Sequence, residues 1–400
     1  MNAKEQKMST KLFYSTPYET KWTTAIKKVI ETNDQIYVLL KETAFYPEGG
    51  GGQPADTGFI DGIRVLDVQM KDNQIYHLME RKPENKLVSC ELDWDRRYDH
   101  MQQHTAQHML SAVLEELFQI TTVSFHLGKE YTTIDIDTAD LTKEQITQLE
   151  NSCNSYIMKN LEIKTHIITH EQVSKFPLRK LPKVTGDIRI VEIDDWDFSA
   201  CAGTHIGRTG ELGVFKIFKT EKHRGQTRVF FLSGWRAIRD YQTAQSILDN
   251  LGTFFKTNKL QLEDRVNKLE LEKKGLTKEL ETLKRENIAF LAEQMLSTQM
   301  EKVIFLSFAD KTIKDLSILA KYLLQKSSCI ILLSSEIDKK ILLQHNGDYP
   351  FHCGKFLKET IQGYEGKGGG NELQAQGTFP TIPQLNACLK EIRERLVESM

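Results

Sequence analysis

Two short pairs of metal-binding side chains, far apart in the sequence, constrain the fold of this chain more than any other feature. His104 and His108 stand four residues apart in a segment whose apolar residues have helical spacing. Residues i and i+4 share one face of a helix, so both imidazoles can reach one ion. Cys201 and His205 stand about 90 residues later, around Gly203, which allows a tight turn. If the four side chains share an ion, a folded cleft must bring these two segments together.

The four side chains form a mixed nitrogen and sulfur set, which suits zinc better than magnesium or calcium. The set indicates one zinc ion per chain, held by His104, His108, Cys201 and His205. The histidine pair alone is a weak signal, and no glutamate follows His104, so the HExxH motif of metallopeptidases is absent. Zinc with four protein ligands is normally structural, whereas catalytic zinc keeps an exchangeable position. The residues leave both roles open.

Length and composition describe a chain of several domains. The 400 residues exceed the usual size of one domain. No apolar run approaches the roughly 20 residues that span a bilayer, and the N-terminus has no signal-peptide pattern, so we expect a cytoplasmic protein. The net charge of −2 is not that of a general nucleic-acid binder. Any contact with RNA therefore depends on local basic patches.

Four regions follow one another along the chain, and together they predict an α+β fold class. Residues 1–95 are rich in short strand patterns and turns, which predict a small β-barrel, or alternatively an open sheet, with a glycine-rich loop. Residues 96–240 combine helical patterns with several strands and predict an α+β domain that contains all four candidate ligands. Residues 241–300 predict a helical coiled-coil arm, and residues 301–400 an independent α/β domain.

The arm is defined by a heptad pattern. An apolar residue recurs at every seventh position from Leu248 to Phe290, and charged residues fill most of the remaining positions. This pattern is typical of a coiled coil or helical hairpin, and it allows a homodimer through the arm and the C-terminal domain. An alternative is a long amphipathic helix that packs on its own domain. We expect a kink or turn at Gly275.

Three separated motifs resemble the alanyl-tRNA editing family, the AlaX proteins, and the matching half of alanyl-tRNA synthetases. The first is the glycine-rich loop, Phe45–Gly58, and the second is the pair HTAQH and CAGTH in the expected order. The third is Gly366–Asn371 with Gln376–Phe379, which looks like the C-terminal DHHA1 module. The family often has CGGTH, where this chain has Ala202 in place of a glycine. The zinc motif alone also resembles threonyl-tRNA synthetase editing domains, but the other two motifs favour the alanyl type.

The resemblance implies a trans-editing hydrolase that removes serine, in some members glycine, from mischarged tRNA(Ala). It assigns His104, His108, Cys201 and His205 to zinc, through which they would act in ester hydrolysis. The ion would either activate a water molecule or grip the substrate's amino group. No segment resembles the adenylate-forming core of the synthetase, so aminoacylation is not expected. Two alternatives stay open: an RNA-binding or dimerisation protein with a structural zinc site, and a metallohydrolase that acts on another substrate.

Substrate and tRNA contacts follow from less specific signals. A pocket that hydrogen-bonds a hydroxyl group can reject the analogue that lacks it. The candidate substrate-binding residues are Thr105, Gln107, Ser124 and His126. The candidate tRNA-binding residues are Arg96, Arg97, Lys222, Arg224, Lys367, Gly368, Gly369 and Gly370, with Lys180, Lys183, Lys219, His223 and Arg228 as further candidates. Charged runs are also common on ordinary solvated faces.

Overall fold

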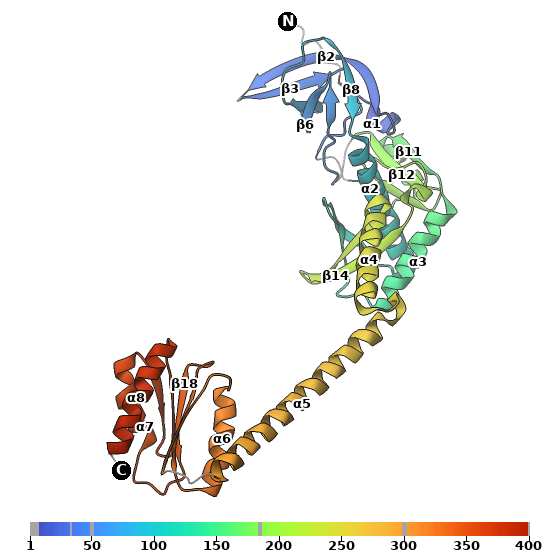
Figure 1. The fold of residues 1–400 in the computed structure, drawn as a ribbon. Helices are drawn as coiled ribbons and strands as arrows, with labels where there is room; N and C mark the ends of the chain where they lie inside the picture. Colours follow the sequence, from blue (N-terminus) through green and yellow to red (C-terminus); the bar gives the residue numbers. More distant parts are fainter. Residues whose placement is uncertain (1–7, 33, 49–51, 183–185, 298–301, 399–400) are drawn as a thin grey trace. The chain divides into compact units, whose positions relative to one another are not determined.

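The computed structural model describes residues 8–32, 34–48, 52–182, 186–297 and 302–398. The chain divides into two compact units, Met1–Asn250 and Leu251–Met400, and each has its own sheets and apolar core (Figure 1). Helices and strands are mixed in both units, in agreement with the predicted α+β class. The finer division into four regions stays a prediction. Among the described residues, no helix combines the length and the apolar character needed to span a membrane.

The first unit begins with six antiparallel strands that close into a barrel in the order β2-β3-β7-β6-β5-β8 (Figure 1). Their bounds are Lys21–Thr32 (β2), Gln35–Leu40 (β3), Gly58–Ile60 (β5), Ile63–Lys71 (β6), Gln74–Met79 (β7) and Leu87–Leu92 (β8). Side chains alternate between the core and solvent, as in β8, where Val88, Cys90 and Leu92 are buried. Three short elements, β1 (Thr10–Lys11), α1 (Leu12–Ser15) and β4 (Glu42–Thr43), lie beside the barrel.

Helix α2 (Trp94–Phe118) follows β8 directly and forms the central element of the first unit. Asp93 is its N-cap, since the carboxylate accepts a hydrogen bond from the backbone N–H of Arg96 at 3.2 Å. The apolar pattern predicts a start at Met101, seven residues too late, because the polar first turns carry no apolar stripe. Every residue from His100 to Leu114 is buried. A buried run this polar is unusual and points to function.

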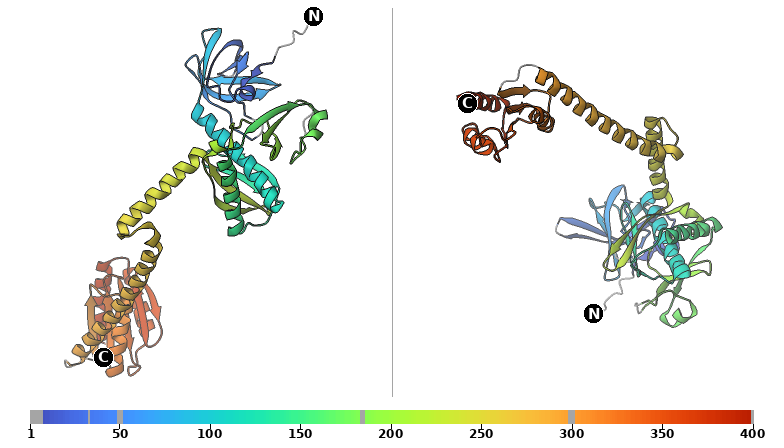
Figure 2. Two further views of the ribbon diagram at one scale, coloured as in Figure 1. Left: turned by 90° about the vertical axis from the view of Figure 1, so that its right-hand side faces the viewer. Right: turned by 90° about the horizontal axis from the view of Figure 1, so that it is seen from below.

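Two sheets and a second helix surround α2 (Figures 1 and 2). A four-stranded antiparallel sheet has the order β14-β15-β10-β9, and a three-stranded one has the order β11-β12-β13. The bounds are Thr122–Leu127 (β9), Thr132–Ile136 (β10), Lys143–Lys159 (α3), Ile163–Ile168 (β11), Ile188–Ile193 (β12), Asp197–Ala200 (β13), Phe215–His223 (β14) and Gln226–Ser233 (β15). The main core joins α2 and α3 to the four-stranded sheet, through residues such as Leu110, Leu149 and Phe231.

The predicted arm is two helices, α4 (Gly234–Phe255) and α5 (Leu262–Ser297). The helices are separate because Lys256 adopts a left-handed φ of 51° and the Asn258 side chain caps the next turn. This break falls between two heptad positions, Phe255 and Leu262, and the coiled-coil arm over 241–300 stays a prediction. Helix α5 continues through Gly275, so the turn expected there is absent. The homodimer stays a prediction.

The second unit has a five-stranded sheet, in the order β16-β17-β18-β20-β19, covered on both faces (Figure 1). Its elements are Val303–Phe308 (β16), Ile313–Lys326 (α6), Ile330–Ser335 (β17), Lys340–His345 (β18), Cys353–Ile361 (α7), Lys367–Gly370 (β19), Gln374–Thr378 (β20) and Ile382–Glu398 (α8). In β17, Ile330 and Leu332 pack against α7 and α8, and Ile331 and Leu333 against α6 and the end of α5. The strand is therefore apolar throughout because both of its faces are covered.

Candidate metal centre

The two remote pairs of candidate ligands meet inside the first unit. Metal-binding atoms of His104, His108, Cys201 and His205 all lie within 4.8 Å of one another. Cys201 Sγ is 3.4 Å from His104 Nε2 and 3.4 Å from His205 Nε2. The rings of His108 and His205 have centroids 4.5 Å apart. Among the described residues, this is the only cluster of three or more such side chains that could hold a metal ion.

Helix α2 and the segment after β13 bring the two pairs together. His104 and His108 lie on one face of α2, and Cys201 follows β13, which pairs with β12 in the three-stranded sheet. Gly203 is required by close approach, because a Cβ there would lie 2.1 Å from Cε1 of His104. Its φ is outside the left-handed region, so the reason is proximity rather than the special turn that the sequence suggested.

Hydrogen bonds orient two of the imidazoles toward the centre of the cluster. His104 Nδ1 lies 3.3 Å from Gln53 Oε1, and His205 Nδ1 lies 3.0 Å from Thr105 Oγ1. The Gln53 side chain is itself held by the backbone N–H of Thr204, which donates to Gln53 Oε1 at 2.9 Å. A partner at one ring nitrogen fixes which nitrogen is free to bind a metal. The Nε2 atoms of His104 and His205 therefore face Cys201.

Arg189 on β12 fixes the backbone of the cysteine segment. Its Nη1 donates to the carbonyl oxygens of Cys201 at 2.9 Å and Gly203 at 2.8 Å. The guanidinium also lies over the Tyr14 ring, 5.1 Å from its centroid. This cation opposes the effect of burial, which raises the pKa of the Cys201 thiol. Burial lowers the pKa of all three histidines, to about 3 for His104, so the imidazoles are neutral.

The cluster fits a tetrahedral zinc site. With Zn–S of about 2.3 Å and Zn–N of about 2.0–2.1 Å, sulfur and nitrogen ligands lie about 3.6 Å apart, close to the S···N distances found here. Among the described residues, the buried Nδ1 atom of His108 has no hydrogen-bond partner, so this nitrogen has no protein group there that would compete with a metal ion. Neutral imidazoles and a thiol that can lose its proton are the donor chemistry that zinc requires.

The sequence motifs missed several residues that build this centre. Gln53 lies in the glycine-rich loop, whose Gly49–Gly51 are outside the described residues. The next residue of that loop, Gly52, has a φ of 77°, and a Cβ there would lie 2.9 Å from the ring of Phe125. Phe125 in turn stacks on His104, with centroids 5.2 Å apart. The one available signal was the position of Gln53 and Gly52 inside a motif that the sequence analysis did quote.

The four candidate substrate-binding residues separate into two groups. Thr105 and Gln107 are buried on α2, where Thr105 contacts His205 and Gln107 donates to Ser111 Oγ at 2.8 Å. Neither faces solvent. Ser124 and His126 are exposed and alternate along β9 with Phe125, the residue that stacks on His104. Side chains alternate across a strand, so these two project from the opposite face of the sheet, and their expected position at the site was wrong.

One candidate tRNA contact is contradicted by its burial. Arg97 is fully buried, and its guanidinium forms an ion pair with Asp56 and donates to the carbonyl oxygens of Pro17 and Ala44. This side chain holds α2 against the loops of the barrel and cannot reach a phosphate. The neighbouring Arg96 is half-buried, and its Nε donates to the carbonyl of Ala55 at 3.0 Å.

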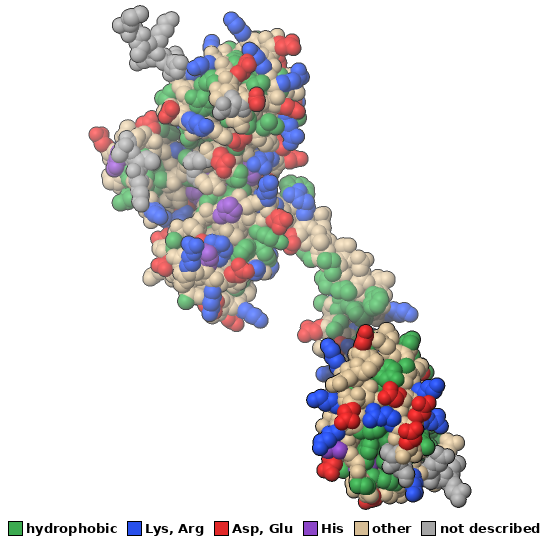
Figure 3. Space-filling view, turned by 90° about the vertical axis from the view of Figure 1, so that its left-hand side faces the viewer, with side chains coloured by type: hydrophobic (Ala, Val, Ile, Leu, Met, Phe, Trp, Pro, Cys, Tyr) green, Lys and Arg blue, Asp and Glu red, His purple; other side chains and the backbone are tan. Residues whose placement is uncertain are grey.

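The other basic candidates are mostly at the surface. Lys222 and Arg224 are exposed in the hairpin between β14 and β15. Arg228 is engaged in an ion pair with Asp135, with Nε 2.7 Å from Oδ1, and Lys183 lies outside the described residues. On the face shown in Figure 3, basic and acidic side chains are interspersed, and no large area carries one sign. Contact of the exposed residues with tRNA stays a prediction.

The C-terminal glycine run is an edge strand rather than a loop. Lys367, Gly368, Gly369 and Gly370 form β19, which is exposed and pairs with β20. A Cβ on Gly368 or Gly370 would lie 2.2 Å or less from carbonyl oxygens of β20, so these two glycines are required for strand packing. Gly369 has no atom within 4 Å of a Cβ position and leaves open space at this edge.

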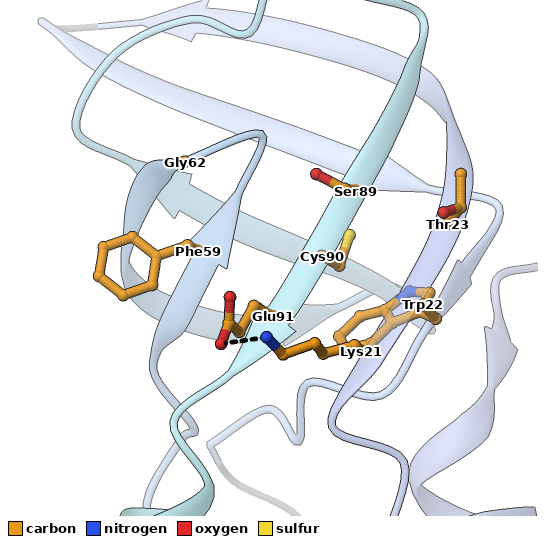
Figure 4. A pocket seen from close by; sticks show the side chains of 8 residues that line it. All are labelled: Lys21, Trp22, Thr23, Phe59, Gly62, Ser89, Cys90 and Glu91. Atoms are coloured by element: carbon orange, nitrogen blue, oxygen red, sulfur yellow. Dashed lines mark ion pairs between the residues drawn. The ribbon is translucent and has the colours of Figure 1, made fainter.

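A hollow on the barrel is not a second chemical centre. It has a volume of about 290 Å³ and is lined by Lys21, Trp22, Thr23, Phe59, Gly62, Ser89, Cys90 and Glu91 (Figure 4). Lys21 Nζ and Glu91 Oε1 form an ion pair at 2.9 Å across its rim. Burial raises the pKa of the Cys90 thiol to about 12, which leaves it unreactive.

Three family models match parts of the chain. They are the threonyl and alanyl tRNA synthetase second additional domain at residues 188–229, class II (A) tRNA synthetases at residues 2–96, and the DHHA1 domain at residues 300–398. The first contains both Cys201 and His205. The second covers the strands of the barrel. The absence of aminoacylation stays a prediction.

Similarity to curated proteins covers almost the whole chain. The alanyl-tRNA editing protein AlaX-L of Pyrococcus horikoshii is 30% identical over 97% of this chain and 100% of its own length. The chain belongs to the alanyl-tRNA editing protein family. The family member Aarsd1 of Danio rerio is 34% identical over 68% of this chain and 67% of its own length. Alanine–tRNA ligase of Pyrococcus furiosus is 30% identical over 96% of this chain, which spans 43% of that longer protein.

Proposed function

We propose that this protein is a trans-editing hydrolase that deacylates mischarged tRNA(Ala), with zinc at His104, His108, Cys201 and His205. The observation that carries the proposal is the convergence of these four side chains from two remote segments inside a family whose named members are alanyl-tRNA editing proteins. The substrates that we propose are Ser-tRNA(Ala) and Gly-tRNA(Ala). We propose a cytoplasmic location and no aminoacylation activity.

Several residues around the four ligands position them for ester hydrolysis. Gln53 and Thr105 orient His104 and His205, and Arg189 holds the carbonyl groups on either side of Ala202. Phe125 covers one face of the His104 ring and keeps bulk water from it. A zinc ion held there would supply Lewis acidity to the ester or to a water molecule. The three histidines are buried, and Cys201 is the ligand with the largest exposed fraction.

In this proposal, polar side chains near the cluster distinguish a seryl group from an alanyl group. The buried face of α2 next to the cluster carries Thr105 and Gln107, which are polar and fixed by hydrogen bonds. We propose that these groups exchange part of this bonding for a hydrogen bond to the hydroxyl of a seryl group, which an alanyl group cannot offer. We further propose that the DHHA1-like domain and the exposed basic residues Lys222, Arg224 and Lys367 contact the tRNA.

The direct test is deacylation of seryl-, glycyl- and alanyl-tRNA(Ala), with and without a metal chelator. The proposal expects hydrolysis of the first two and loss of activity in the chelator, with recovery on added zinc. His108→Ala should lose at least about 100-fold in kcat/KM, because loss of a ligand disturbs a metal site more than loss of a residue that only hydrogen-bonds to a ligand. The matched control is His170→Ala, an exposed histidine of the same unit.

The fold of the chelated protein distinguishes a catalytic zinc ion from a structural one. Circular dichroism of the chelated protein should keep its native spectrum while hydrolysis is lost. Unfolding of the first unit on chelation would instead support the structural role. An unchanged rate in His108→Ala would remove the proposed centre from the reaction.

A further inference from the structure

A second pocket lies beside the metal centre in the first unit. It has a volume of about 370 Å³, and four of its lining residues are the cations Arg96, Lys129, Arg236 and Arg239. Two carboxylates also line it, but one of them, Asp99, forms an ion pair with Arg236, with Nε 2.7 Å from Oδ1. Among the described residues, no ion pair joins Arg96, Lys129 or Arg239 to an acidic side chain. With four cations against the carboxylates of Asp95 and Asp99, the lining of the pocket has a net positive charge.

A buried histidine forms the inner wall of this pocket. His100 is 4% exposed, and its Nδ1 atom has no hydrogen-bond partner within the described parts of the chain. A buried polar atom without a partner is costly, so its presence at a pocket wall points to a ligand atom that would satisfy it. Burial and then the charges of Arg96 and Arg236 lower the pKa of His100 to about 3, so its imidazole is neutral.

The pocket and the metal centre are neighbours because the same three elements build both. On α2, His100 stands one turn before His104, a rise of about 6 Å along the helix on the same face. In the glycine-rich loop, Gln53 contacts His104 and the next residue, Pro54, lines the pocket. On β9, Phe125 stacks on His104 and Leu127 lines the pocket.

We propose that this pocket binds the phosphate of the terminal nucleotide of the tRNA while the aminoacyl ester lies at the metal centre. This inference rests on the proposed function. A single sugar separates that phosphate from the ester oxygen, which matches a pocket one helical turn away from the cluster. Arginine and lysine side chains are the usual partners of a phosphate, and the His100 ring can donate an additional hydrogen bond. The pocket would hold the 3′ end in register and leave the amino acid to the metal centre.

The test uses two stable inhibitors of Ser-tRNA(Ala) hydrolysis by the full-length protein. Both carry serine on adenosine through an amide in place of the ester, and one of them also carries a 5′-phosphate. We expect the phosphorylated analogue to inhibit at about tenfold lower concentration, because a charged hydrogen-bond network is lost without the phosphate. Inorganic phosphate alone should not inhibit at the concentration at which the phosphorylated analogue does.

Matched variants assign the effect to the pocket. Lys129→Gln with Arg239→Gln removes two exposed cations and should make the two analogues equal inhibitors, with little change for the unphosphorylated one. Lys143→Gln with Lys175→Gln removes the same charge elsewhere on the unit and should keep the tenfold difference.

Three results would contradict phosphate binding by the pocket without contradicting the proposed hydrolase function. They are equal inhibition of the wild-type protein by both analogues (including none by either), inhibition by inorganic phosphate at the same concentration as the phosphorylated analogue, and loss of the difference in the control variant. Absence of Ser-tRNA(Ala) hydrolysis by the wild-type protein would instead contradict the proposed function itself.

Discussion

At the scale of single residues, the CAGTH segment offers a matched pair of substitutions. Gly203→Ala places a Cβ 2.1 Å from the His104 ring, so the ring must move out of the cluster. We expect a loss of about 10–100-fold in zinc affinity, the range for changes that disturb ligand orientation. Ala202→Gly creates the sequence CGGTH, and we expect zinc affinity close to that of the wild-type protein. Competition with a zinc chelator of known affinity measures both.

The residue scale also shows what a sequence can and cannot predict. The grouping of His104, His108, Cys201 and His205 was predictable because ligand chemistry and i, i+4 spacing are visible in sequence. The role of Arg97 was not, because a buried arginine paired with Asp56 looks in sequence like any other basic residue. The positions of Ser124 and His126 depend on which face of β9 meets α2, and tertiary packing decides that.

At the scale of elements, the barrel carries a buried histidine that makes its stability depend on pH. His77 on β7 is fully buried, its Nε2 is 2.8 Å from Thr43 Oγ1, and burial lowers its pKa to about 4. The unfolded chain, with an ordinary histidine pKa of about 6.5, binds a proton in this range that the folded chain does not. The stability that comes from keeping His77 neutral is therefore fully present above about pH 6.5, and it is lost as the pH falls toward 4.

A variant with no titrating group at position 77 isolates the effect of His77 on the pH dependence of stability. Between pH 7.5 and 5.0, His77 should account for a loss of about 2 kcal/mol in the free energy of unfolding. His77→Gln should lose less than the wild-type protein by that amount, which denaturant unfolding at the two pH values measures. Equal losses in both proteins would mean that His77 does not titrate differently on folding.

The sequence predicts helices and strands well where their apolar residues are strongly periodic. It predicts their ends poorly where a polar capping residue determines the end. The pattern placed β16 at Val303–Phe308, as the structure has it, because that strand is apolar at most positions. The start of α2 and the break between α4 and α5 depend instead on the capping side chains Asp93 and Asn258. Such local hydrogen bonds leave no periodic trace.

At the scale of the whole molecule, the division into two units predicts separable functions. A protein that ends after Phe255 keeps every element of the metal centre and lacks the DHHA1-like domain. We expect its kcat on Ser-tRNA(Ala) to be near that of the full chain, and its KM to rise by at least about tenfold, because one of two tethered binding sites is lost. Steady-state kinetics of the two proteins provides the measurement. An unchanged KM would remove the second unit from tRNA binding.

The same truncation tests the predicted homodimer. Several apolar residues of α5 are exposed in the single chain, among them Leu276, Leu283 and Phe290. If the arm forms a dimer, light scattering should give twice the chain mass for the full protein and one chain mass for the truncated one. A single-chain mass for both would leave these residues simply exposed.

X-ray absorption at the zinc edge of the purified, catalytically active protein is the most direct test of the metal centre. One sulfur at about 2.3 Å and three nitrogens at about 2.0–2.1 Å, with one zinc per chain, are the predicted shell. Cys201→Ala should abolish the sulfur contribution and the hydrolysis of Ser-tRNA(Ala) together. An active protein without stoichiometric zinc, or one whose zinc has only oxygen neighbours, would contradict the account.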